Sequence, residues 1–208
     1  MERRFRRPAM LDPQEAARIP DGTDPATRSQ LAYTTAAALV DRGRQHAGSD
    51  PDLLDRLVAF VDEEGLEAIA ELWSHSPGRS LPGALWRLYV LREWVRQDPH
   101  TIAQRFDLGR QRAEVSGAIA GVAQPPGPDD VCRTADAVLA GVYDGDLDVA
   151  LDRAAAFLLV VATGSALDAD LIADDTAAHH LTRRASALTE TATDLRAAAE
   201  LWRTGDLQ

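Results

Sequence analysis

The segment AHHLTRRASALTETATDLRAAAELW (178–202) decides the fold class of this chain, because it holds a strict heptad repeat. Alanine recurs at one seam position and a large apolar residue recurs at the other (Ala178, Ala185, Ala192, Ala199; Leu181, Leu188, Leu195, Trp202). This 3–4 alternation is typical of a helix whose narrow apolar seam faces another helix. Because alanine adds little bulk, the partner helix is expected to lie unusually close.

The residues beside the seam indicate where its partner lies. They include no acid, so a second copy in register gains no attractive charge pairing (Thr182, Thr189, Arg196, Arg203; Ala177, Arg184, Thr191, Ala198). The first long helix instead carries a stripe of small residues that Leu39 interrupts (Ser29, Ala32, Ala36, Gly43). The sequence therefore predicts that the C-terminal helix packs antiparallel on the first long helix of the same chain.

The composition of the chain and the positions of its helix-breaking and helix-capping residues favour an all-α fold. Hydrophobic residues make up 45% of the 208 residues and aromatic residues only 5%, so alanine and leucine must fill the core. Proline, glycine and Asx caps delimit helical intervals, and no alternating strand pattern occurs between them. We expect a compact bundle of about seven to nine helices (24–47, 50–61, 66–73, 80–97, one or two in 101–123, 131–143, 147–163 and 167–203).

Two of these helices are expected to lie centrally. The helix at 81–95 has apolar residues on several sides, and 154–163 (AAAFLLVVAT) carries no charge. Arg87, Arg92 and Glu93 interrupt the first of them, so they must reach the rim of the core or find partners.

The domain organisation is predicted to be simple. Residues 1–7 (MERRFRR) carry four Arg and one Glu, which suggests a flexible Arg-rich arm over 1–12. Residues 13–208 are expected to form a single helical domain. The segment QPPGPDD (124–130) is the clearest linker and the place for a subdivision.

Charge and composition exclude several classes of function. The net charge of −11 disfavours a general nucleic-acid coat or an anionic membrane surface as partner. All basic residues are arginine, so Schiff-base and P-loop lysines are ruled out. No apolar signal region follows the arm, the longest apolar run (154–162) is too short to span a bilayer, and Cys132 has no disulfide partner in the chain. We therefore expect a cytoplasmic protein without a membrane segment.

The segment PHTIAQRFDLGRQRAEV (99–115) resembles the core of a helix-turn-helix motif. Ala103 is the small residue of the first helix, Leu108 and Gly109 form the turn, and Ala113 closes against Ala103. The resemblance implies that Arg110, Gln111 and Arg112 begin a recognition helix and that Arg105 also contacts DNA. Asp107 departs from the motif, since glycine is usual there. A plain packed corner is the alternative interpretation.

A second resemblance concerns carboxylates. EEGLE (63–67) is similar to the E-E-x-x-E opening of MazG-like nucleotide pyrophosphohydrolases, all-α enzymes that bind magnesium. The required second E-x-x-D is missing, because Glu93 and Asp98 are five residues apart. Glu71/His75 and Asp175/His179 have the i,i+4 spacing of metal ligands, but surface ion pairs explain them better, because two such pairs on distant helices would have to converge. We therefore assign no metal or cofactor.

The whole chain resembles the short Ala/Arg-rich helical proteins of high-GC actinobacteria, on the phrases LPGALWRLYVLREWVRQDP (81–99) and LRAAAELW (195–202). That resemblance implies no activity. The leading hypothesis is an adaptor, accessory or regulatory protein without a catalytic site, acting on a protein partner. A homodimer through the Trp86/Trp94 helix is one form this could take. A DNA-binding protein and a carboxylate-metal nucleotide hydrolase are the alternatives.

Overall fold

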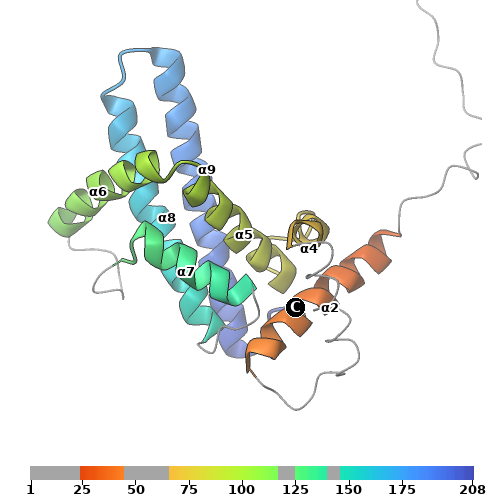
Figure 1. Ribbon diagram of the computed structural model, residues 1–208. Coiled ribbons are helices and arrows are strands. Elements are labelled where there is room, and N and C mark those ends of the chain that lie inside the picture. The colour runs from red at the N-terminus through yellow and green to blue at the C-terminus, as the bar shows by residue number, and fades with distance from the viewer. Residues whose placement is uncertain (1–23, 45–65, 117–124, 140–145) are drawn as a thin grey trace, which may run out of the picture.

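The computed structural model describes residues 24–44, 66–116, 125–139 and 146–208, and within these ranges it contains helices and no strands (Figure 1). The helices are α2 (Pro25–Arg44), α4 (Leu66–Trp73), α5 (Leu81–Gln97), α6 (Pro99–Ser116), α7 (Pro128–Leu139), α8 (Leu147–Asp170) and α9 (Asp175–Thr204). The predicted all-α class is therefore confirmed. The arm at 1–12, the helix at 50–61 and Glu63 and Glu64 lie outside the described residues.

The longest elements, α8 and α9, form a helical hairpin. The sequence predicted a helix over 147–163 and another over 167–203, but α8 continues to Asp170 and the turn falls at 171–174. Asp174 explains the later start of α9, because its carboxylate accepts a hydrogen bond from the backbone N–H of Ala177 (2.7 Å). No glycine or proline marks this turn.

The alanine seam of α9 faces α8, so the predicted partner helix was wrong. Ala185, Ala192, Leu195 and Ala199 are buried, and α9 packs chiefly on α8. A short turn joins the two helices, so they run antiparallel (Figure 1). The described part of α2 packs instead on α5, α4 and α7. The partner is therefore the neighbour in sequence, the helix that directly precedes α9.

On a second face of α8, helix α6 crosses α8 in direct backbone contact. A Cβ atom on Gly109 would clash with the carbonyl oxygen of Val160, and one on Gly164 would clash with that of Arg105. Phe106 and Phe157 stack beside the crossing, with ring centroids 5.5 Å apart. Two glycines thus let the helices approach until their backbones touch, and α6 and α9 together cover most of α8.

Helix α5 begins and pairs its charges as the sequence predicted. Ser80 accepts a hydrogen bond from the backbone N–H of Gly83, and proline occupies the first turn. The helix packs against α7, α2, α4 and α9. Arg92 forms ion pairs with Glu93 and with Asp136 of α7. Its guanidinium therefore reaches partners at the rim of the core, as expected.

The remaining described segments close the bundle around α5. The indole N–H of Trp73 in α4 donates a hydrogen bond to Thr35 of α2 (3.0 Å), and both residues are buried. After α9, Gly205 adopts φ of 79°, and the chain turns back so that Leu207 is buried. The main-chain oxygen of Gln208 then accepts a hydrogen bond from the N–H of Leu81 (2.9 Å). Helix α7 starts at Pro128, inside the predicted linker.

Helix α8 is the one helix in the described ranges that has the length and apolar composition of a membrane span. Most of that stretch is buried inside the bundle by the other helices. Its hydrophobicity is that of a core helix, which is consistent with a soluble protein.

Replacing Gly109 or Gly164 with alanine is expected to lower the free energy of unfolding by about 1–3 kcal/mol, because the new methyl group forces the α6 and α8 backbones apart. Urea denaturation of each variant measures the loss. Gly127→Ala is the matched control, since a Cβ there meets nothing nearer than 3.8 Å. Equal stability of all three variants would contradict the backbone contact.

Ala192→Leu is expected to destabilise the fold by about 1–3 kcal/mol, because residue 192 is fully buried in the α8–α9 seam and a larger side chain overpacks it. Thermal unfolding monitored by circular dichroism provides the measurement. Ala187→Leu makes the same change at an exposed position of α9 and should leave the melting temperature nearly unchanged. The seam assignment fails if the two variants melt alike.

Candidate functional site

A groove runs between α5 and α9, and we refer to it below as the α5–α9 groove. Its volume is about 440 Å³, within the range of pockets that hold a small ligand or an inserted side-chain cluster. Leu91 of α5 and Leu158 of α8 contribute to its buried part. The other lining residues come from α5, α9 and the segment after α4 (Trp86, Arg87, Val90, Trp94; Leu188, Thr191; Ser74, Ser76).

The α5 wall of the groove is an apolar row at the edge of the core. Trp86, Val90 and Trp94 recur every four residues, so they lie on one face of the helix. Val90 is 43% exposed, while the two indoles are half-buried. Trp86 stacks on Tyr89 with ring centroids 5.6 Å apart, which fixes the position of its ring. The row is therefore a preformed apolar surface.

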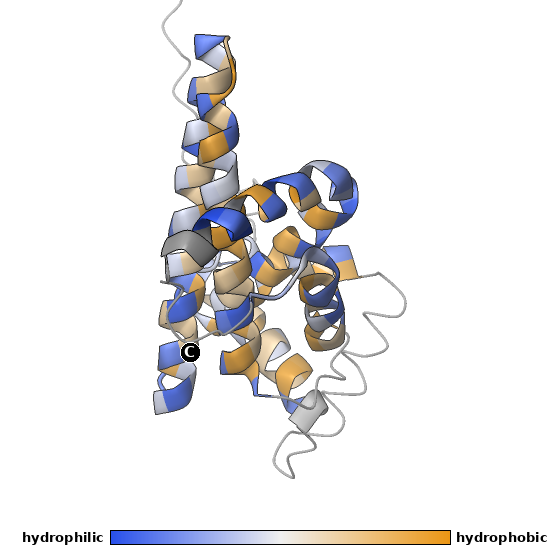
Figure 2. Ribbon diagram, turned by 90° about the vertical axis from the view of Figure 1, so that its left-hand side faces the viewer, coloured by the Kyte–Doolittle hydropathy of each residue, from blue (hydrophilic) through white to orange (hydrophobic). Residues whose placement is uncertain are grey.

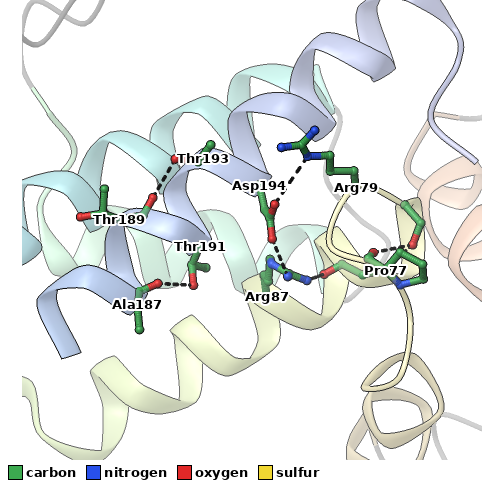
Figure 3. Close-up of polar contacts among 10 residues, drawn as sticks. Pro77, Arg79, Arg87, Ala187, Thr189, Thr191, Thr193 and Asp194 are labelled. Carbon is green, nitrogen blue, oxygen red and sulfur yellow. Dashed lines mark hydrogen bonds and ion pairs between the residues drawn. The ribbon is translucent and has the colours of Figure 1, made fainter. Parts of the chain in front are cut away.

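One part of the groove wall carries an ion-pair cluster (Figure 3). Arg87 donates to Asp194 of α9 (2.7 Å) and to the carbonyl oxygen of Gly83 (3.1 Å). Arg79 contacts the other oxygen of Asp194 at 3.7 Å. Two guanidinium groups thus share one carboxylate, so this cluster has a formal charge of +1 in a chain whose net charge is −11. The Nε atom of Arg87 is buried without a hydrogen-bond partner.

Two of the hydroxyl groups that line the groove, those of Ser74 and Thr191, are already hydrogen-bonded to backbone carbonyls. Thr191 donates to Ala187 (2.9 Å), as Figure 3 shows, and Ser74 donates to Glu71 (2.7 Å). Ser74 also lies 2.9 Å from Nδ1 of His75. Because the hydroxyl proton of Ser74 is directed to a carbonyl, this contact is not the activated nucleophile–base pair of a hydrolase. The groove is thus suited to binding through shape and apolar contact.

The predicted helix-turn-helix geometry is wrong. Residues 99–115 lie within the single helix α6, and Gly109 is inside that helix at its crossing with α8. Arg105 is mostly buried and pairs with Asp168 of α8 (3.2 Å). Arg110, Gln111 and Arg112 are exposed beyond the crossing. Contact of these side chains with nucleic acid stays a prediction, without the motif that suggested it.

The carboxylate and histidine candidates are not brought together in the part of the chain that the structure describes. Glu67 and Glu71 are exposed on α4, and within the described ranges no three His, Cys, Asp or Glu side chains form a metal-binding group. Cys132 is half-buried on α7, and burial together with the nearby carboxylate of Asp136 raises the pKa of its thiol. A raised pKa disfavours the thiolate, so Cys132 is a poor nucleophile.

The sequence indicated only one wall of the groove. The row of Trp86, Val90 and Trp94 was visible as a second stripe on α5, but Leu188 and Thr191 were read as seam and flank of a helix packed on α2. Once α9 packs on α8, Leu188 lies at the edge of the seam and faces the groove.

Comparison with family models, with curated proteins and with solved structures finds no match to this chain. The functional argument therefore depends on the geometry of the chain itself.

Asp194→Ala is expected to lower the free energy of unfolding by about 1–3 kcal/mol. The substitution removes a charged hydrogen bond that joins α5 to α9, and it leaves the partly buried guanidinium of Arg87 without its carboxylate partner. Chemical denaturation tests this. Arg133→Ala removes an exposed i,i+3 ion pair and should cost about 0.5 kcal/mol or less. Similar losses in both variants would mean that the Arg87–Asp194 contact does not join the helices.

Proposed function

We propose that this chain is an accessory or regulatory protein that acts through protein contacts, and that the α5–α9 groove is its contact surface. The apolar row of Trp86, Val90 and Trp94, with an exposed valine between two half-buried indoles, carries this proposal, because tryptophan is enriched where protein partners bind most tightly. We further propose that the protein acts in the cytoplasm, where the unpaired Cys132 stays reduced.

The shape of the groove supports a protein segment as its occupant. Both walls are helices, so the groove presents two rows of side chains between which apolar residues of a partner can insert. The hydroxyl groups of Ser74 and Thr191 donate to backbone carbonyls, so neither is directed at a bound small molecule. Two half-buried indoles offer large contact area at low cost in side-chain entropy.

A single exposed valine provides the test. Val90→Glu places a charge in the middle of the apolar row, whereas Val149→Glu makes the same change at an equally exposed valine on α8 (43% and 45% exposed). Tagged wild type and both variants are used for affinity capture from the cells that express the protein. We expect Val90→Glu to lose at least about tenfold of a protein that wild type and Val149→Glu retain.

The captured protein is then purified and its affinity for the three chains is measured by calorimetry. Equal retention by all three chains, or equal affinity, would show that the groove is not the contact surface. Circular dichroism confirms that both variants are folded.

A further inference from the structure

The hairpin tip, which we define as residues 166–178, extends beyond the other described helices (Figures 1 and 2). Leu171 at its end is 79% exposed, the most exposed large apolar side chain in the described ranges. It is flanked by Ile172 and by the acids of DLIADD (170–175), which has three Asp and no basic residue. The helical hairpin thus presents an exposed leucine and a half-buried isoleucine next to three exposed aspartates.

This tip and the α5–α9 groove are chemically complementary. The groove offers an apolar row and an ion-pair cluster of formal charge +1, formed by Arg79, Arg87 and Asp194. The tip offers apolar side chains and carboxylates. In a chain with a net charge of −11, a local positive cluster beside an apolar groove favours an acidic apolar segment over a basic one.

We propose that the occupant of the groove is the hairpin tip of a second copy of this chain. The proposal rests on the function proposed above and names the segment that the groove receives. Leu171 and Ile172 insert against Trp86, Val90 and Trp94, while Asp170, Asp174 and Asp175 lie near Arg79.

The length of α9 is compatible with a closed dimer. Leu188 lies roughly 20 Å along α9 from its first residue, at about 1.5 Å of rise per residue. The tip and the groove of one chain are therefore too far apart to meet. Two chains related by a twofold axis, with their hairpins side by side and antiparallel, place each tip at the groove of the other. Exposed Ala166, Ala173 and Ala177 leave room for the second hairpin.

Because the contact occurs twice in such a dimer, single substitutions have a large effect. Sedimentation velocity of the full chain over a range of concentrations should show a reversible dimer that weakens with added salt. Leu171→Glu in the tip and Val90→Glu in the groove should each weaken the dimer at least about tenfold per contact, so about a hundredfold in all. Val149→Glu, the matched control, should dimerise like wild type.

Mixing the two weakened variants separates this arrangement from other dimers. Leu171→Glu keeps an intact groove and Val90→Glu keeps an intact tip, so the mixed dimer contains one native contact. Its other contact carries both substitutions, whose effects do not add because the first already removes the apolar contact, so the mixed dimer should form at concentrations where neither variant dimerises alone. Arg79→Glu should weaken the wild-type dimer through charge repulsion with the tip, because Arg79 is mostly exposed and its loss does not disturb the core.

Three results would overturn the proposal: a wild-type chain that stays monomeric, a Leu171→Glu variant that dimerises normally, or a mixture that forms no dimer. If the wild type is monomeric while Val90→Glu still loses its captured protein, this inference fails and the proposed function stands. If Val90→Glu loses nothing in capture and dimerisation is absent, both fail.

Discussion

The uncharged length of α8 is the constraint on which the structure depends, because a helix that is apolar on all sides has to be covered on all sides. Its residues from Ala154 to Ala162 are buried apart from the half-buried Leu159. Neighbouring helices cover these residues by packing at short distance, because small side chains at the contacts let the helix backbones come close together. Alanine lines the contact with α9, and glycine allows the backbone contact with α6 at Gly109 and Gly164. Aromatic residues are then needed only at a few places, which agrees with their low share of 5%.

From the sequence, the helices that pack at close distance could be predicted correctly. The helix that each of them packs against could not. The heptad of α9 specifies a narrow seam for any facing helix with small residues, and such rows occur both in α2 and in α8. Only the turn at 171–174 decides between them, because it makes α8 the nearest neighbour of α9. That turn contains no glycine or proline, so its single signal was Asp174, a helix cap among many acids. The prediction of α2 as partner failed for this reason.

Gly109 shows how a local pattern can point to the wrong cause. In the sequence it follows Leu108 as a turn glycine would, and arginines come after it. In the structure it lies inside α6, where the absence of a side chain allows contact with the backbone of α8. The residue that explains it, Gly164, is far away in the sequence. A local motif search cannot detect such a pair, because each glycine alone is compatible with a turn.

The surfaces that form the candidate site remain open because the described neighbouring helices cover α8 and α5 incompletely. Among the described helices, only α9 accompanies α8 beyond the crossing with α6, and a pair of helices shares one interface, so the described neighbours leave the remaining faces of the hairpin tip uncovered (Figures 1 and 2). Likewise α5 is apolar on more sides than its described neighbours cover, which leaves Val90 exposed beside the groove. The chain therefore has two apolar surfaces without partners in its described part, one convex and acidic, the other concave with a positive cluster. A structure that leaves matching surfaces open at the tip of the hairpin and near the middle of α9 is suited to association between chains.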